Sequence, residues 1–142
     1  MMAELTLPPP TEFGLPDKFT AWRPYQVEAL NKAVDSDRRF VVQCAPTGFG
    51  KTVLYVAQAV MTGARTAVLT STKALQRQLT DEFMSLGLVD IRGQGNYRCL
   101  EINDEYHNTV DYGACHVGEY CPRKAGGCYY YDALRKVTGV KV

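Results

Sequence analysis

The sequence predicts an α/β fold, in which a parallel sheet with helices on its faces is joined to an irregular segment organised by cysteines. Three observations predict it. Up to Ile91, short apolar runs rich in β-branched residues alternate with helical patterns. A glycine-containing loop connects the first of these runs to the next helical pattern. After Ile91, four of the five cysteines lie in a stretch rich in Gly, Tyr and charge.

The chain is expected to begin with an irregular lead-in and a helix. Residues 1–18 carry four of the seven prolines, which favours an extended, irregular conformation. Pro24 suits the first turn of a helix, because the N–H that proline lacks has no partner there. The pattern that follows places Val27, Leu30 and Val34 on one helical face.

Three short segments have the composition of buried strands. Residues 39–45 and 65–71 are apolar and β-branched, as parallel strands covered on both faces are. Residues 88–91 have the composition of a third strand. A helix is predicted over residues 51–61, so the order is strand, helix, strand, helix, strand.

The second helix of that series is predicted over residues 73–86. Thr72 precedes it and can cap its first turn with a side-chain hydroxyl. Leu75, Leu79 and Phe83 share one face, which we expect to be buried.

The overall composition excludes some classes of protein but does not indicate a binding partner. Basic and acidic residues nearly balance, at 16 and 15, so a nucleic-acid surface would have to be local. No apolar run is long enough to span a bilayer, and the N-terminus lacks the pattern of a secretory signal. We expect a cytoplasmic protein without a membrane partner, whose cysteines serve as metal ligands or core residues rather than disulfides.

Residues 44–52, Cys-Ala-Pro-Thr-Gly-Phe-Gly-Lys-Thr, predict a phosphate-binding loop. The glycines let backbone N–H groups face phosphate oxygens, Lys51 reaches the β- and γ-phosphates, and the Thr52 hydroxyl binds Mg²⁺. Ala45 replaces the first glycine of the general pattern, which is the form typical of helicases. Lys51 and Thr52 are the predicted catalytic positions, and Cys44 is expected to be a small buried core residue. The predicted nucleotide contacts in the loop are Thr47, Gly48, Phe49, Gly50, Lys51, Thr52 and Val53.

Four cysteines after the loop predict a metal centre. Cys99, Cys115, Cys121 and Cys128 lie in a segment with too little apolar material to bury free thiols. Four thiolates suit zinc or an iron–sulfur cluster, and their spacing alone leaves the choice open. The nearby His107 and His116 are interpreted as surface residues or as residues that surround the ligands, because four thiolates already fill such a site.

Several of these motifs resemble elements of superfamily 2 helicases. Residues 19–26, FTAWRPYQ, resemble the adenine-reading element, in which Gln26 would contact the base with Arg23 and Phe19 nearby. Residues 70–79 resemble the element called motif Ia. There Thr70, Ser71, Thr72 and Lys73 would grip a nucleic-acid phosphate, or Thr72 would simply cap the helix.

The cysteine segment completes the resemblance. GNYRC at residues 95–99, Cys121-Pro122 and Cys128-Tyr129-Tyr130-Tyr131 are similar to the cluster domain of XPD/DinG-type iron–sulfur helicases. In that family four cysteines between motif Ia and the DEAH motif bind a [4Fe–4S] cluster. The chain carries the motifs in the family's order, from about Phe19 to its last residue.

The resemblance implies a partial RecA-like P-loop NTPase domain with an inserted iron–sulfur domain. It divides the chain into a lead-in over 1–18, an NTPase segment over 19–94, the cluster domain over 95–131 and a return segment over 132–142. From the residues alone, the stretch over 130–142 is expected to begin as a helix and to end in a β-prone run. ATP, Mg²⁺ and a [4Fe–4S] cluster are the implied cofactors. A monomer acting in DNA repair is the implied state.

Single-stranded or forked DNA is the implied partner. The residues expected to contact it are Tyr97, Arg98, Arg123, Lys124 and Tyr129–Tyr131, although at least one tyrosine of that run is expected to pack around the cluster. The alternative is a non-catalytic nucleic-acid-binding or regulatory module that keeps the metal site, with zinc in place of the cluster. A small P-loop kinase would leave the cysteines without a role.

A helicase also needs an Asp-Glu pair at the end of a buried strand. Asp81-Glu82 lies within a predicted helix, on the wrong kind of element. Residues 104–107 spell Asp-Glu-Tyr-His but lack a preceding apolar strand and fall between the first two cysteines. The family pattern would place the true motif beyond Val142. The chain is therefore expected to be the N-terminal part of a larger enzyme, or a remnant of one, with turnover near background.

Overall fold

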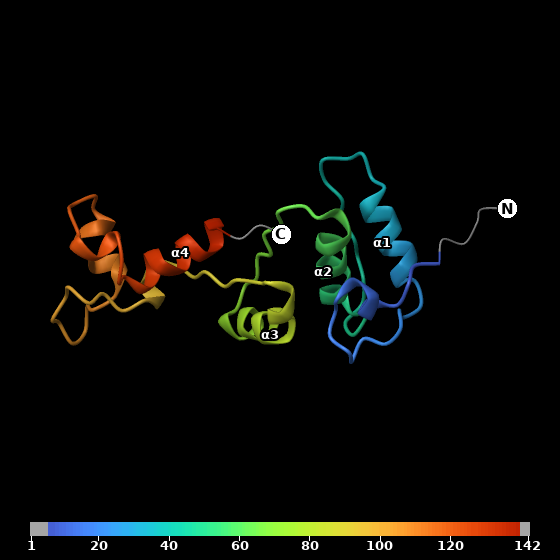
Figure 1. The fold of residues 1–142 in the computed structure, drawn as a ribbon, viewed down its shortest axis with the longest axis horizontal. Coiled ribbons are helices and arrows are strands. Elements are labelled where there is room, and N and C mark those ends of the chain that lie inside the picture. The colour runs from blue at the N-terminus through green and yellow to red at the C-terminus, as the bar shows by residue number, and fades with distance from the viewer. Residues whose placement is uncertain (1–5, 140–142) are drawn as a thin grey trace. The chain divides into compact units, whose positions relative to one another are not determined.

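The computed structural model describes residues 6–139, which divide after Gly87 into two compact units (Figure 1). The first unit is described over residues 6–87 and the second over residues 88–139. Among the described residues, no helix is long and apolar enough to cross a lipid bilayer.

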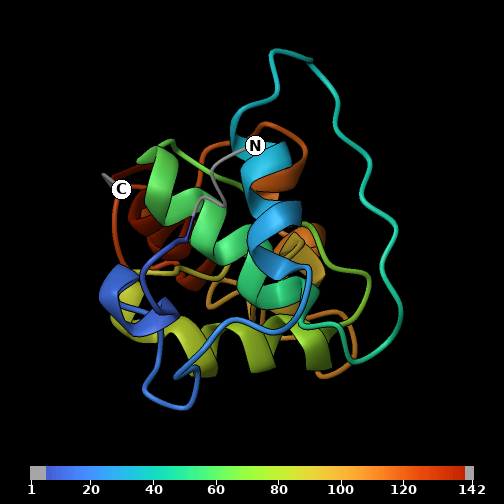
Figure 2. The same ribbon diagram turned by 90° about the vertical axis from the view of Figure 1, so that its right-hand side faces the viewer.

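The first unit is built from three α-helices and two short 3₁₀ turns. The α-helices confirm the predicted ones: α1 (Gln26–Val34), α2 (Lys51–Thr62) and α3 (Lys73–Phe83). The 3₁₀ turns are η1 (Pro10–Phe13) and η2 (Met84–Leu86). Helix α1 lies beside α2 in both views of the ribbon (Figures 1 and 2). Helix α3 begins as predicted, because the Thr72 hydroxyl accepts a hydrogen bond from the Leu75 N–H at 3.2 Å.

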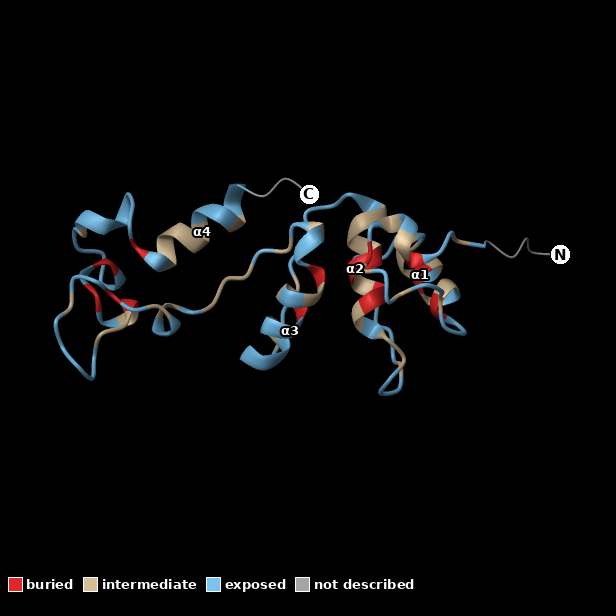
Figure 3. Cartoon of the chain, turned by 60° about the horizontal axis from the view of Figure 1, so that its bottom comes forward, coloured by how far each residue is buried: buried red, intermediate tan, exposed pale blue. Residues whose placement is uncertain are grey.

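The core of the first unit gathers around α2. Its buried residues are Leu15, Leu30, Val53, Leu54, Val56, Ala57, Leu79 and Phe83 (red in Figure 3). The Phe19 ring stacks on Phe83, with ring centroids 5.9 Å apart. Of the two predicted apolar faces, Leu30, Leu79 and Phe83 are buried, Val27 and Val34 are half-buried, and Leu75 is exposed.

The proline-rich lead-in is more ordered than the sequence predicted. Its Pro10–Phe13 segment forms η1, and Pro10 is among the most deeply buried residues of the chain. The Trp22 indole N–H donates to the Pro8 carbonyl at 2.7 Å, and the Trp22 ring meets Phe13. Proline side chains are apolar, so a segment without regular structure can still contribute to the core.

The predicted parallel sheet is not present in residues 6–139, which contain no strand. The segments over 39–45, 65–71 and 88–91 run without ladder partners, and Val42 and Leu69 are 87% and 95% exposed. Cys44 is exposed as well, so its prediction as a core residue was wrong. A strand is stabilised by hydrogen bonds to a second strand, and the composition of one segment does not show which segment it pairs with.

The second unit contains one α-helix and several single turns around a small core. The turns are η3 (Gln94–Asn96), η4 (Val110–Tyr112), η5 (Ala114–His116) and η6 (Pro122–Lys124), and the helix is α4 (Tyr129–Gly139). One antiparallel bridge joins Arg98 to Thr109, supported by the Cys99 N–H bond to the Asn108 carbonyl at 2.7 Å. The predicted C-terminal helix is confirmed but extends to Gly139. The rest of the predicted β-prone run, residues 140–142, lies outside the described residues.

Candidate nucleotide and metal sites

The glycine loop has the backbone conformation that its sequence predicts. Gly48 and Gly50 have φ of 82° and 86°, a left-handed conformation that glycine adopts without strain. Helix α2 begins at Lys51, directly after Gly50. The first N–H groups of a helix lack partners within the helix and carry partial positive charge, so the loop ends at a natural site for phosphate.

Lys51 is folded back onto its own loop. Its ammonium donates to the carbonyls of Ala45 and Pro46, the latter at 3.1 Å. The side chain is exposed and lines a cleft of about 650 Å³ beside the loop. Thr52 is half-buried at the start of α2, while the Val53 side chain points into the core, so only the backbone of Val53 is available to a nucleotide.

Gln26 and Arg23 hold the loop from the side of α1. The Gln26 side-chain oxygen accepts from the Arg23 N–H at 2.8 Å, and its amide nitrogen donates to the Phe49 carbonyl at 2.7 Å. The Arg23 guanidinium donates to the Gly48 carbonyl. Gln26 is 3% exposed. The structure therefore joins the predicted adenine-reading residues to the phosphate loop, with both polar atoms of the Gln26 amide bonded within the protein.

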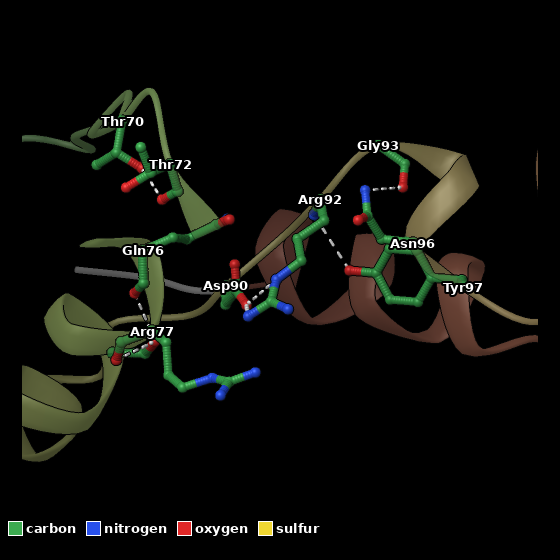
Figure 4. Close-up of polar contacts among 10 residues, drawn as sticks. Thr70, Thr72, Gln76, Arg77, Asp90, Arg92, Gly93, Asn96 and Tyr97 are labelled. Carbon is green, nitrogen blue, oxygen red and sulfur yellow. Dashed lines mark hydrogen bonds and ion pairs between the residues drawn. The ribbon is translucent and has the colours of Figure 1, made fainter. Parts of the chain in front are cut away.

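The other residues predicted for the nucleotide and DNA sites have simpler surroundings. Phe19 lies against Phe83 rather than beside the loop, and Thr47 is exposed. At the start of α3, Thr72 acts as the helix cap and accepts a long 3.5 Å contact through its carbonyl from the Thr70 hydroxyl (Figure 4). Ser71 and Lys73 are exposed.

The four cysteines of the predicted metal centre come together in the second unit. Cys99, Cys115 and Cys128 are buried in one cluster with Val110, and the half-buried Cys121 packs against it. All four are free thiols. The side chains around them belong to Tyr97, Ile102, Tyr130 and Tyr131.

Gly113 forms part of the wall of this four-cysteine cluster. A Cβ atom at Gly113 would lie 3.2 Å from the Cys99 sulfur and 3.7 Å from the Cys115 sulfur. Its φ of −79° is ordinary, so the backbone itself would accept another residue. The absence of a side chain at Gly113 leaves the space into which two of the thiols project.

The pKa values of one thiol and one hydroxyl are raised in this unit. Burial raises the pKa of the Cys115 thiol, and a hydrogen bond from the Tyr131 hydroxyl opposes that rise. Burial also raises the pKa of the Tyr131 hydroxyl, and the neighbouring Cys115 adds to this rise. The other cysteines also raise the pKa of the Cys115 thiol, because a negative charge on one sulfur disfavours a second. Their effects decrease in the order Cys121, Cys128 and Cys99.

The donors suit a soft metal centre, but they do not enclose a single ion. Thiolates bind zinc and iron–sulfur clusters. Within residues 6–139, no three His, Cys, Asp or Glu side chains are arranged to hold one metal ion. The cysteines are therefore neighbours that supply suitable donors, without forming a closed site for one ion.

Several tyrosines and cations near the cysteines already have partners within the protein. The Tyr97 hydroxyl accepts from the Arg92 N–H at 3.1 Å, and Arg92 pairs with Asp90 (Figure 4). The Tyr97 ring meets Tyr130 edge-on. Arg123 pairs with Glu101.

Tyr130 and Tyr131 of the 129–131 run both pack against the cysteines, whereas packing around a bound cluster stays a prediction. Tyr129 is 56% exposed. Sequence reasoning missed three other exposed aromatic residues of this unit, Tyr106, Tyr112 and Tyr120. Their only signal is their position beside glycines or in the irregular stretch between the cysteines.

The two acidic pairs that imitate a helicase motif lie in ordinary surroundings. The Asp104 carboxylate accepts the N–H groups of Tyr106 and His107, both at 2.7 Å, and these bonds lower its pKa. Asp104 is thus an exposed turn residue and does not follow a strand. Glu82 lies in α3 and pairs with Lys18 at 2.6 Å. Both histidines are exposed, as expected of surface residues.

A glycine loop at a helix N-terminus, with a lysine and a hydroxyl in place, defines a P-loop nucleotide-binding protein. Comparison with protein families identifies it further. The model of the DEAD/DEAH box helicase family matches residues 23–112, which is more than half of the chain. The chain therefore belongs to the DEAD/DEAH box helicase family, whose motor domains are RecA-like and use ATP and Mg²⁺.

One curated relative is similar to this chain. It is the ATP-dependent DNA helicase YoaA of Haemophilus influenzae, 33% identical over 54% of this chain. The match covers 13% of the relative, so this chain spans a small part of that helicase's length. No solved structure matches the chain.

Proposed function

We propose that this chain is the ATP-binding and cluster-binding part of a DNA helicase of the XPD/DinG type. The observation that carries the proposal is the gathering of four cysteines, scattered over residues 99–128, into one group in a chain that also holds a helicase-type phosphate loop. A nucleotide site alone is common to many protein classes. Both features together are what the iron–sulfur helicases combine.

Nucleotide binding is assigned to the loop between Ala45 and Thr52. ATP phosphates would replace the carbonyls of Ala45 and Pro46 as partners of the Lys51 ammonium. The backbone N–H groups at the start of α2 would face the same phosphates, and Thr52 would hold Mg²⁺. Gln26 and Arg23 would keep the loop in the shape that this binding needs.

The cluster is assigned to the cysteines. Cys99, Cys115, Cys121 and Cys128 would each supply one thiolate to a [4Fe–4S] cluster, which when bound offers one-electron chemistry and a rigid inorganic core. Few apolar side chains are buried in this unit besides the cysteines and Val110. The cluster would therefore also stabilise the fold of residues 88–139.

Single-stranded DNA is assigned to the surface of the same unit. The charges of residues 88–139 nearly balance, so binding would depend on local contacts rather than on a broadly basic face. Arg98 and Lys124 are exposed, as are Tyr106, Tyr120 and Tyr129. Cations would meet phosphates, and the tyrosine rings would stack on bases.

The chain itself is proposed to bind nucleotide weakly and to turn it over near the background rate. Phosphoryl transfer needs a carboxylate placed beside Mg²⁺ and water. Residues 104–107 form an exposed turn and are not proposed for this role. The test is steady-state ATP hydrolysis by the purified chain and by Glu105→Gln. Equal background rates are expected, and helicase-like turnover that Glu105→Gln abolishes would contradict the proposal.

The identity of the metal decides between this proposal and its alternative, a zinc-containing binding or regulatory module without a motor. The chain is purified without oxygen, and its iron, inorganic sulfide and zinc are measured. Iron with sulfide in a cluster's proportion is expected. One zinc per chain without sulfide would reject the iron–sulfur assignment and leave the nucleotide assignment standing.

A further inference from the structure

Tyr25 has an unusual backbone conformation just before α1. Its φ of 66° is left-handed, and among residues 6–139 it is the one residue other than glycine with a positive φ. A side chain is strained in that region, and strained residues concentrate at ligand sites. Tyr25 is 75% exposed, so packing in the core does not account for its conformation.

Tyr25 lines the same cleft of about 650 Å³ that Lys51 lines. The cleft lies between α1, α2 and the extended segment over residues 41–46. The Gln43 amide donates to the Ala29 carbonyl at 2.5 Å and thereby ties that segment to α1. Most of the lining is apolar, and its aromatic residues are Tyr25, Phe49 and Tyr55. A mostly apolar cleft of this size suits a small organic ligand.

The polar side chains in and beside the cleft are bonded to other protein groups. Glu28 and Lys32 pair with each other at 2.6 Å, and the Gln43 amide is bonded to α1. Gln26, expected to read adenine, is buried with both polar atoms of its amide bonded. Lys51 is the cation that the loop motif devotes to phosphates. The cleft therefore offers a ligand aromatic faces and one cation for phosphate.

We propose that this cleft holds the base and ribose of a nucleotide whose phosphates lie on the loop, and that the Tyr25 ring stacks on the base. The inference rests on the nucleotide site assigned above, and it adds where the base lies and how it is held. Every nucleobase has an aromatic face, so stacking tolerates purines and pyrimidines alike. The chain is therefore expected to bind nucleoside triphosphates as a class.

The test separates the base from the phosphates. Affinities of the full chain for ATP, GTP and inorganic tripolyphosphate, which lacks base and ribose, are measured by calorimetry with Mg²⁺ present. Tyr25→Leu removes the ring and keeps an apolar side chain in the same strained conformation, whereas Tyr25→Phe keeps the ring. Phe40→Leu is the matched control, because Phe40 is 79% exposed in the neighbouring extended segment and does not line the cleft.

Tyr25→Leu is expected to weaken the binding of ATP and of GTP by about fivefold or more, while tripolyphosphate binds as tightly as to wild type. Tyr25→Phe and Phe40→Leu are expected to bind all three ligands like wild type. Unchanged ATP affinity in Tyr25→Leu would overturn the inference, as would an equal loss for tripolyphosphate or an equal loss in Phe40→Leu. A wild-type chain that binds neither ATP nor tripolyphosphate would reject the nucleotide site itself.

A labelling experiment on the wild-type chain needs no variant. Its probe is ATP with a photoreactive azide on the adenine ring, which on irradiation attaches to the residues beside the base. Labels identified by mass spectrometry are expected on the lining of the cleft, on Tyr25 above all, and excess tripolyphosphate should prevent them. Labels confined to residues outside the cleft would overturn the inference even if Tyr25→Leu fails to fold.

Discussion

Gly50 illustrates how one residue of the motif serves two purposes. Its φ of 86° disfavours any side chain, and a Cβ there would also lie 2.6 Å from the Gln26 amide nitrogen. Gly48 has a similar φ, but a Cβ there would meet nothing within 4 Å. The sequence pattern predicts glycine at both positions for the sake of phosphate. The contact with Gln26 depends on how a distant helix packs, which the pattern does not contain.

Alanine at these two positions separates strain from contact. Gly48→Ala is expected to cost about 1–2 kcal/mol of unfolding free energy through its backbone conformation alone. Gly50→Ala should cost more, because it also displaces Gln26. Adding Gln26→Ala to Gly50→Ala should remove the steric contact with Gln26 but leave the backbone strain. Urea unfolding of the four proteins measures these differences, and equal losses for the two glycine variants would count against the Gln26 contact.

Gln26 was predicted to read adenine, whereas its observed bonds favour a role in bracing the loop. Gln26→Ala leaves the Phe49 carbonyl and the Arg23 N–H without their partner, at a cost of about 1–3 kcal/mol. A bracing residue affects all nucleotides alike, so the affinities for ATP and GTP should fall by the same factor. Fluorescent analogues of both nucleotides measure this, and a loss confined to ATP would instead support base reading.

Gly113 gives a corresponding test at the proposed metal centre. Gly113→Ala places a methyl group 3.2 Å from the Cys99 sulfur, so we expect the bound iron to fall well below the wild-type level. Gly126→Ala is the control, since a Cβ there meets nothing within 4 Å and the residue lies between two of the cysteines. Iron content per chain is the measurement. Equal iron in both variants would show that the proposed iron–sulfur cluster does not depend on the space beside Gly113.

At the scale of elements, the helices predicted from the sequence are present in the structure and the predicted strands are not. The helices α1, α2 and α3 are each specified within their own residues, by a cap such as Thr72 and by apolar spacing. A strand needs a partner, and the segments over 39–45 and 65–71 have none among the described residues. Their apolar, β-branched composition indicates a preference for extended conformation but carries no information about which strands pair.

Two leucines allow this difference between helices and predicted strands to be measured as unfolding free energy. Leu79 in α3 is 4% exposed, whereas Leu69 in the second predicted strand is 95% exposed. Leu79→Ala should lower the unfolding free energy by about 2–5 kcal/mol. Leu69→Ala should change it by no more than about 0.5 kcal/mol. Chemical denaturation of both variants provides the comparison, and a large loss for Leu69→Ala would show that this segment is covered in solution.

At the scale of the whole molecule, the two units depend on different kinds of stabilisation. The first buries leucine, valine and phenylalanine around α2, and the second buries three cysteines and Val110. The sequence predicted this contrast, because apolar periodicity ends near Ile91 and four of the five cysteines follow from Cys99 onward. It left the choice of metal open, since spacing does not tell how far apart four sulfurs will lie.

Loss of one ligand should therefore loosen one unit alone. Cys121→Ser is expected to lose the metal and to speed amide hydrogen exchange across residues 96–131. Exchange in α1 and α2 should stay at the wild-type rate, because their core contains none of the cysteines. Exchange measured by mass spectrometry on peptide fragments resolves the two regions. Faster exchange throughout both would mean that the units fold cooperatively.

The docking of the indole of Trp22 onto Pro8 supplies the protein with its own optical probe. Trp22 is the only tryptophan of the chain, and it is adjacent to Arg23, which binds the phosphate loop. Its emission therefore reports a single location, with no need for a dye. Quenching by iodide would follow release of the proline segment, and a spectral change on adding ATP would register movement at the loop.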